Sequence, residues 1–386
     1  MFGDRQFQGV FSKLYLASSL LAAGLLLAEQ SAPVASISAA ELPHDKAVAA
    51  LNSGGSPVFS SQRLICQLMQ IEQESLPALS PSAQDTGNNL KSLKRQEKDA
   101  PPVAATPCLT WIDPLAKLKG VLLCVHGLGL HKGTYQQLGE RMAPLGWGVY
   151  AVDVRGFGTF MEMPGERRVD FPGCLEDVRQ ALLFVHKTHP GVPVFLLGES
   201  MGGAIALRVT AMHPELVDGL ISSVPGGDRF HQAGDAVKVG MKLLTGPNKT
   251  MDVTDIVVNR STNKEELRQA WLKDPLARFS LTPVELIQFQ HFMDDNSHWA
   301  KKITQTPVLM LQGDKDQLVK KQSNESIVNE IPSKDSVLVF VDTGEHLIVE
   351  EGQFTGYVID TLCGWLNDHT SAAVQSPRQG VDSASN

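Results

Sequence analysis

From residue 108 onward, short apolar runs alternate with segments of helical periodicity. The runs are rich in Val, Leu and Ile and mostly continuous, which is typical of parallel strands buried on both faces of a sheet. The run at 217–224 is the least regular, because Asp218 and Gly219 interrupt it. The six runs occupy residues 121–125, 148–152, 193–197, 217–224, 307–311 and 336–341.

The segments between the runs carry apolar residues every three or four positions, as helices do when they pack on a sheet. One stripe joins Tyr135 to Leu145, and a second joins Leu175 to Val185. The second helix is expected to stop at the helix-breaking segment 189–191, which reads His-Pro-Gly. The alternation predicts an α/β fold with a mostly parallel central sheet, helices on both faces and right-handed crossovers.

Residues 226–302 break the alternation. They contain no convincing strand pattern but several helical stretches, such as 263–273 and 283–293. Because the insertion is long for a simple crossover, we expect a helical cap over the carboxyl edge of the sheet, where open α/β sheets bind their ligands.

The first 40 residues resemble a secretory signal in their layout. Arg5 and Lys13 flank an apolar run at 14–28, and small residues follow. The run is shorter than the roughly 20 residues of a membrane-spanning helix. We favour an export signal; an uncleaved anchor and an ordinary apolar helix are the alternatives. Export or membrane association is therefore expected, and a cytoplasmic location is disfavoured.

Composition completes the domain prediction. Residues 41–102 are rich in Ser, Pro, Gln, Asn and Gly and are expected to form a largely disordered linker. A folded domain is expected at 103–370, followed by a disordered tail at 371–386. The net charge of -8 disfavours a nucleic-acid partner. Five scattered cysteines give no disulfide framework, and the absence of CxxC and HExxH motifs means that no zinc site is suggested.

The segment 198–202 contains a G-x-S-x-G motif that follows a predicted strand and opens a predicted helix. In this context the motif predicts a nucleophile elbow, a sharp turn that raises the Ser200 hydroxyl above the sheet. Gly198 and Gly202 are small enough to let the strand and the helix approach. The alternative is a glycine-rich turn with Ser200 as a helix cap.

A serine nucleophile needs a base and a carboxylate, and both follow later predicted strands. His346 comes directly after the last run, whereas His369 lies in the polar tail and is a poor rival. Asp316 and Asp314 both follow the 307–311 run. We prefer Asp316 and assign Asp314 to the turn, and the order Ser, Asp, His fits this arrangement.

The tetrahedral intermediate of such a reaction needs two backbone N–H donors. Met201, the residue after the nucleophile, is expected to supply one. Leu128, in the small-residue loop that follows the first strong strand, is expected to supply the other. His126 begins this loop and is expected to hold it in place rather than to transfer protons.

These motifs resemble the monoacylglycerol lipase and lysophospholipase branch of the α/β-hydrolases, whose domain is also classified as serine aminopeptidase. The resemblance extends from residue 109 to about 366. It implies the α/β-hydrolase fold, no cofactor, a triad of Ser200, Asp316 and His346, and oxyanion donors at Leu128 and Met201. The matching segments are 126–129 with His131 and Tyr135, 150–158, 165–169, 190–206 and 274–276.

The chain departs from this branch at three positions near the site. Glu199 stands where the lipases usually have His, which places a carboxyl beside the nucleophile and is expected to alter substrate or pH preference. Leu130 replaces an acidic residue and Thr134 a basic one. These two changes put monoacylglycerol itself in doubt.

The expected reaction is two-step acyl transfer from a carboxylic ester, with a lipid such as a monoacylglycerol or lysophospholipid as substrate. Contact with a membrane surface is consistent with this substrate and with the leader. An aminopeptidase, thioesterase or acyltransferase would use the same triad, and Glu199 is the only hint of a carboxylate for a substrate ammonium. A non-catalytic binding protein is the remote alternative. Apolar cap residues are expected to shelter an acyl chain or to pack the cap on itself; they are Val257, Leu267, Trp271, Leu272, Leu276, Phe279, Leu286 and Phe289.

Overall fold

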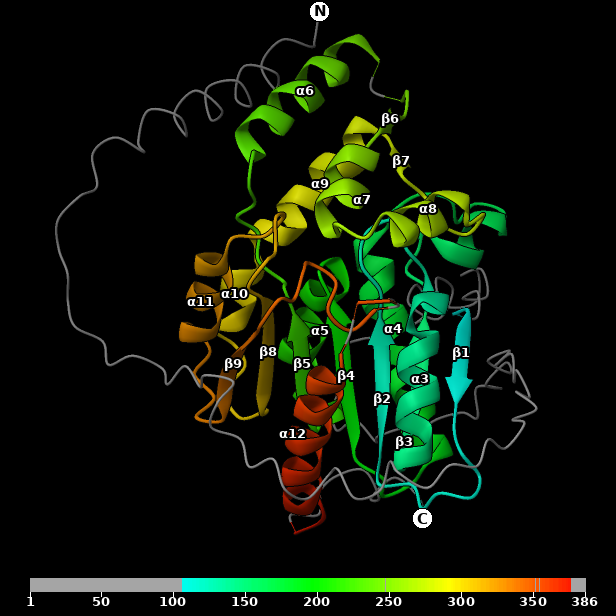
Figure 1. Ribbon diagram of the computed structural model, residues 1–386, viewed down its shortest axis with the longest axis vertical. Coiled ribbons are helices and arrows are strands. Elements are labelled where there is room, and N and C mark those ends of the chain that lie inside the picture. Colours follow the sequence, from blue (N-terminus) through cyan, green and yellow to red (C-terminus); the bar gives the residue numbers. More distant parts are fainter. Residues whose placement is uncertain (1–105, 247, 351, 354, 376–386) are drawn as a thin grey trace, which may run out of the picture. The chain divides into compact units, whose positions relative to one another are not determined.

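The computed structural model describes residues 106–375, except 247, 351 and 354 (Figure 1). The leader at 1–40 and the linker at 41–102 lie outside the described residues, so export or anchoring stays a prediction. Within the described part of the chain, no helix has both the length and the apolar character needed to cross a membrane.

A seven-stranded sheet forms the centre of the described domain, in the order β1-β3-β2-β4-β5-β8-β9. All strands are parallel except β1, which pairs antiparallel with β3 at one edge. All six predicted runs are strands. The sequence pattern missed β1, because a four-residue edge strand with one buried residue shows no continuous apolar run. The strands are β1 (Cys108–Trp111), β2 (Gly120–Val125), β3 (Trp147–Val152), β4 (Val194–Glu199), β5 (Gly219–Ser223), β8 (Val308–Gly313) and β9 (Ser336–Val341).

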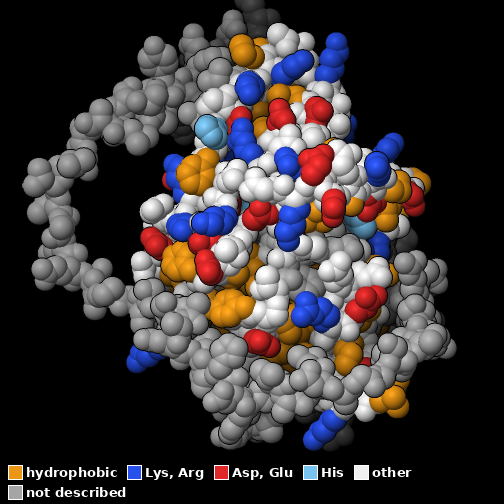
Figure 2. Space-filling view, in the orientation of Figure 1, with side chains coloured by type: hydrophobic (Ala, Val, Ile, Leu, Met, Phe, Trp, Pro, Cys, Tyr) orange, Lys and Arg blue, Asp and Glu red, His pale blue; other side chains and the backbone are white. Residues whose placement is uncertain are grey.

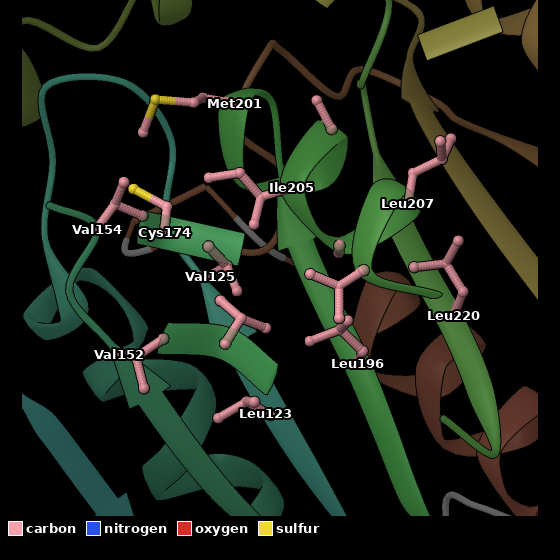
Figure 3. Packing of buried hydrophobic residues seen from close by; sticks show 14 of the residues in the cluster. Leu123, Val125, Val152, Val154, Cys174, Leu196, Met201, Ile205, Leu207 and Leu220 are labelled. Carbon is pink, nitrogen blue, oxygen red and sulfur yellow. The ribbon is translucent and has the colours of Figure 1, made fainter. Parts of the chain in front are cut away.

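Successive strand residues point to opposite sides of the sheet. Because the residues on both sides are apolar, helices cover both faces. Leu123 and Val125 pack with α4 and α5 (Figure 3), whereas Leu122 and Cys124 pack with α3 and α12. The covering helices are α3 (Gln136–Met142), α4 (Phe171–Thr188), α5 (Met201–Met212), α10 (Asn296–Ala300), α11 (Lys321–Asn329) and α12 (Gly356–Gln375).

The last helix extends farther than expected. We predicted a disordered tail from residue 371, but α12 continues to Gln375. The extension includes Ala372 and Ala373, and alanine has the highest helix propensity of all residues. The buried first part of the helix supplies a nucleus from which these residues can continue.

The segment 226–302 is mostly helical, as predicted. It also contains a two-stranded ribbon that the sequence pattern missed, because strands of two residues show no periodicity. The helix α9 begins at a capping box in which Thr282 and Glu285 satisfy each other's backbone N–H groups. The elements are α6 (Gln232–Thr245), β6 (Met251–Asp252), α7 (Thr254–Ser261), α8 (Glu265–Lys273), β7 (Ser280–Leu281) and α9 (Pro283–Asp294).

The parallel strands direct their carboxyl ends to one edge of the sheet, where the connecting loops meet the cap helices (Figure 1). Every predicted site residue lies in or next to one of these loops. In the described part of the chain, four short 3-10 helices complete the connections: η2 (Lys132–Tyr135), η3 (Ala143–Leu145), η4 (Gly158–Glu162) and η5 (Pro214–Leu216).

Candidate active site

The turn between β4 and α5 has the geometry of a nucleophile elbow. Ser200 has φ 54° and ψ -114°, a backbone conformation that residues other than glycine rarely adopt. A Cβ on Gly198 would lie 2.1 Å from the Gly202 carbonyl oxygen, and one on Gly202 would lie 1.9 Å from that of Val125. No side chain fits at either position: Gly198 is confined by α5, as expected, whereas Gly202 is confined by the end of β2.

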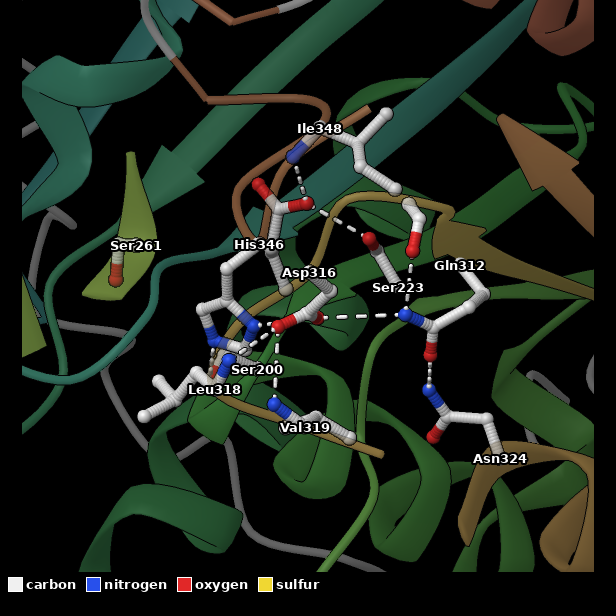
Figure 4. Close-up of polar contacts among 12 residues, drawn as sticks. Ser200, Ser223, Ser261, Gln312, Asp316, Leu318, Val319, Asn324, His346 and Ile348 are labelled. Atoms are coloured by element: carbon white, nitrogen blue, oxygen red, sulfur yellow. Dashed lines mark hydrogen bonds and ion pairs between the residues drawn. The ribbon is translucent and has the colours of Figure 1, made fainter. Parts of the chain in front are cut away.

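The structure brings Ser200, His346 and Asp316 together in one hydrogen-bonded chain (Figure 4). The distance from Ser200 Oγ to His346 Nε2 is 2.9 Å, and that from His346 Nδ1 to Asp316 Oδ2 is also 2.9 Å. All three are buried, with exposed fractions of 6%, 1% and 8%. In this arrangement His346 can accept the serine proton while Asp316 accepts the Nδ1–H.

The choice between the two aspartates is resolved by their hydrogen bonds. Asp316 Oδ1 accepts the backbone N–H groups of Leu318 and Val319, at 2.7 and 2.9 Å, while its Oδ2 faces His346. Asp314 instead pairs with Lys315 at 3.7 Å. The sequence did not predict that Gln312 would also approach Asp316 Oδ2, at 3.4 Å.

The loop 126–130, called the oxyanion loop below, is held at the end of β2 by His126. Its Nε2 accepts the N–H of Val154 and its Nδ1 lies 2.8 Å from the Gly127 carbonyl oxygen, so the proton resides on Nδ1. Burial lowers the pKa of His126 to about 4, which keeps the ring neutral. The predicted holding role is confirmed. The N–H groups of Leu128 and Met201 have no hydrogen-bond partner among the described residues.

Two fully buried carboxyl groups lie behind this site. Glu199 accepts hydrogen bonds from Ser223 Oγ and from the backbone N–H groups of residues 348–350. Glu350, which the sequence pattern did not single out, accepts the N–H of Gly127 at 2.7 Å. Burial raises the pKa of Glu199 to about 7 and that of Glu350 to about 8. No sequence motif predicts a role for Glu350, because only the fold brings it to the oxyanion loop.

The cap is tied to the oxyanion loop by polar contacts. His131 Nε2 lies 2.8 Å from Asp274 Oδ2, and the N–H of Arg278 donates to the Gly129 carbonyl at 2.8 Å. Asp274 and His131 both lie in segments that the sequence matched to the family, but the contact between them was not predicted.

A cavity of about 1020 Å³ lies beside α8 and η2, and none of the three triad residues lines it. Of the eight apolar cap residues expected to shelter an acyl chain or pack the cap, Leu267, Trp271 and Leu276 line this cavity. Leu272 is 46% exposed. The other four pack into the main hydrophobic core.

Comparison with known proteins places this site in a family. Residues 116–353 match the family described as serine aminopeptidase, S33. The monoglyceride lipases of Mus musculus and Homo sapiens are each 31% identical to the chain over 273 residues, which are 69% of the chain and 88% of each relative. The monoacylglycerol lipase of Mycolicibacterium smegmatis is 24% identical over 254 residues, 65% of the chain and 89% of that relative.

Solved structures confirm the fold. The monoacylglycerol lipase of Paleococcus ferrophilus has a TM-score of 0.58 at 21% identity, covering 68% of the chain and 99% of that structure. A soluble variant of the Saccharomyces cerevisiae monoglyceride lipase, in complex with a substrate analog, has a TM-score of 0.58 at 19% identity, covering 78% and 96%.

We expect Gly202→Ala to destabilise the protein, because the new methyl group would overlap the Val125 carbonyl. The free energy of unfolding, measured in urea, should fall by about 1–3 kcal/mol. The control is Gly364→Ala in α12, where a Cβ meets nothing within 4 Å. It should be neutral or stabilising by up to about 1 kcal/mol. Equal stability of the two variants would contradict the close contact at the elbow.

Proposed function

The chain belongs to the serine aminopeptidase S33 family of α/β-hydrolases, and from this membership we propose that it is a serine hydrolase that cleaves carboxylic esters of lipids. The hydrogen-bonded chain of Ser200, His346 and Asp316 is the observation that carries the proposal. The names of its relatives support a lipid ester as the substrate class. A monoacylglycerol or a lysophospholipid is the candidate substrate.

In the first proposed step, Ser200 Oγ attacks the ester carbonyl carbon while His346 Nε2 takes the serine proton. Asp316 accepts the hydrogen bond from Nδ1 and stabilises the imidazolium. The N–H groups of Leu128 and Met201 bind the oxyanion. The C–O bond then breaks, and His346 gives its proton to the leaving alcohol, which leaves an acyl group on Ser200.

In the second step, water replaces the alcohol. His346 takes a proton from the water, and the resulting hydroxide attacks the acyl carbonyl. The same two N–H groups bind the second oxyanion. The imidazolium then returns its proton to Ser200 Oγ, and a carboxylic acid is released. This cycle needs only groups that the chain itself supplies.

Glu199, the one sequence feature that favoured an aminopeptidase, does not support that alternative. A substrate ammonium would need a carboxylate that faces the substrate, and Glu199 was the candidate. Its side chain is fully buried, and both oxygens already accept hydrogen bonds from the protein. We therefore place an ester above an amide as the bond that is cleaved.

Contact with a membrane surface belongs to the same proposal. In α6, Leu244 and Met241 are 76% and 59% exposed, and Lys238 and Lys242 lie on the same short helix. Figure 2 shows hydrophobic and basic side chains near each other at this end of the domain. Exposed apolar and basic side chains on one helix favour an anionic lipid surface. The apolar run at 14–28 supports export or anchoring of the chain.

A fluorophosphonate probe tests the nucleophile. We expect one probe molecule per wild-type chain, measured by intact mass, and none on Ser200→Ala. Ser280→Ala, at an exposed position in β7, is the control and should label like wild type. Monoacylglycerols, lysophospholipids, short p-nitrophenyl esters and aminoacyl amides, assayed in parallel, distinguish the substrate classes. A folded wild-type protein that does not label would overturn the proposal.

The two aspartates give a matched pair of variants. Asp316→Asn should lower kcat by a factor on the order of 10⁴, because the amide no longer holds His346 in the required tautomer. Asp314→Asn should keep kcat within about threefold, since substitutions outside the triad leave the proton transfer intact. Hydrolysis of a p-nitrophenyl ester measures both. If Asp314→Asn showed the larger loss, the assignment of Asp316 would be wrong.

Vesicle sedimentation tests the membrane contact. Leu244→Asp should lower the fraction bound to phosphatidylserine-containing vesicles by about tenfold, because a buried leucine contributes roughly 1.5–3 kcal/mol. Leu115→Asp, at a position 91% exposed and outside the cap, should bind like wild type. Equal binding by both variants would exclude α6 as the contact.

A further inference from the structure

Three segments of the candidate site meet at the two buried carboxyl groups. Glu199 belongs to the elbow, and Glu350 ends the segment 346–350, called the His346 loop below. The carboxyl of Glu199 accepts the N–H groups of Ile348 and Val349, at 2.5 and 3.1 Å, and that of Glu350 at 3.0 Å. These donors cannot act as acceptors, so their hydrogen bonds favour the ionised form of the Glu199 carboxyl.

The surroundings of Glu350 favour the opposite protonation state, although the His131 carbonyl also accepts the backbone N–H of Thr134 at 3.1 Å. Thr134 Oγ lies 2.6 Å from Glu350 Oε2 and 2.8 Å from the carbonyl oxygen of His131. A threonine hydroxyl has one proton, and a carbonyl can only accept. The Thr134 proton satisfies the His131 carbonyl if Glu350 carries a proton and donates it to Thr134 Oγ. The other oxygen of Glu350 accepts the N–H of Gly127 in the oxyanion loop.

The titratable groups around Glu199 and Glu350 also favour a single proton shared between the two carboxyls. The titratable groups that face it are Cys124 on β2, Tyr135 in η2 and His346. No lysine or arginine of the described residues hydrogen-bonds either carboxyl. Two neighbouring carboxylates in a buried site repel each other, and protonation of one removes the repulsion.

We propose, on the basis of the ester hydrolase function above, that Glu199 and Glu350 are positioning residues that form a carboxylate–carboxylic acid pair. The pair holds the His346 loop and the oxyanion loop against the nucleophile elbow. It touches no substrate atom and acts through the segments that carry His346 and Leu128. Ionisation of Glu350 removes its donor to Thr134 and places a second negative charge beside Glu199, and the repulsion weakens the hold of the elbow on the His346 loop.

Variants of Glu350 separate this role from simple packing. Glu350→Gln copies the acid, because its amide oxygen accepts from Gly127 and its NH₂ group donates to Thr134. Glu350→Ala should lower kcat on p-nitrophenyl butyrate at pH 7 by about tenfold or more, since the loss of a supporting hydrogen bond commonly costs that much. Glu350→Gln should restore kcat to within about threefold of wild type.

The pH profile is the second measurement. Wild-type kcat should fall as the pH rises through about 8, where Glu350 ionises. Glu350→Gln cannot ionise and should lack this decrease. The exposed Glu140→Gln, in α3, is the control and should keep the wild-type profile. Glu199→Gln should lower kcat by about tenfold or more with little change in KM, because its NH₂ group would face backbone N–H donors.

Thermal unfolding tests the pair without catalysis. The folded protein retains the Glu350 proton from the ordinary pKa of 4.5 up to about 8, whereas the unfolded chain loses it. Stability from this proton is therefore complete below pH 4.5 and is lost as the pH rises to 8. The Tm of wild type should fall relative to that of Glu350→Gln over this range.

Two results would overturn the proposal that Glu199 and Glu350 form such a pair. One is a Glu350→Gln variant as impaired as Glu350→Ala, and the other is a Tm difference that does not change with pH. A wild-type protein that neither labels with fluorophosphonate nor cleaves any ester would instead refute the proposed function. The Tm comparison would still decide the protonation of Glu350 in that case.

Discussion

The rest of the site depends on the close contact between β4 and α5 at Ser200. Helix α5 approaches β4 so closely that only glycine fits at position 198, and the end of β2 lies so close to α5 that only glycine fits at position 202. This contact forces the unusual backbone angles of Ser200 and places its hydroxyl at the edge of the sheet. It also leaves the N–H of Met201 at the start of a helix, where no intrahelical partner exists. One packing constraint therefore positions both the proposed nucleophile and one proposed oxyanion donor.

The parallel sheet brings the other two residues of the proposed triad to the same place. Asp316 follows β8 and His346 follows β9, and both strands end at the edge where β4 ends. Backbone N–H groups of Leu318 and Val319 then orient the aspartate, which orients the imidazole. A short loop after each strand is sufficient, because the sheet already fixes the direction in which each loop leaves.

Buried polar groups connect the loops that carry this chemistry. Isolated carboxyl groups are costly to bury, and Glu199 and Glu350 are tolerated because each of their oxygens has a hydrogen-bond partner. Their partners come from β5, the His346 loop, the oxyanion loop and η2, so the hydrogen bonds that satisfy the two carboxyls also hold these segments in place. The contact between His131 and Asp274 extends this connection to the cap.

The sequence by itself determined the α/β architecture, the six parallel strands and the G-x-S-x-G turn, because apolar runs and glycine spacing are local properties of the chain. It also ranked Asp316 above Asp314 and His346 above His369 from their positions after predicted strands. Only the tertiary structure decided the polar support of the site. Glu350 belongs to no local pattern, and its partners Gly127 and Thr134 lie more than 200 residues away in the chain. Its burial depends on contacts that exist only when β4, the His346 loop and the oxyanion loop are packed together.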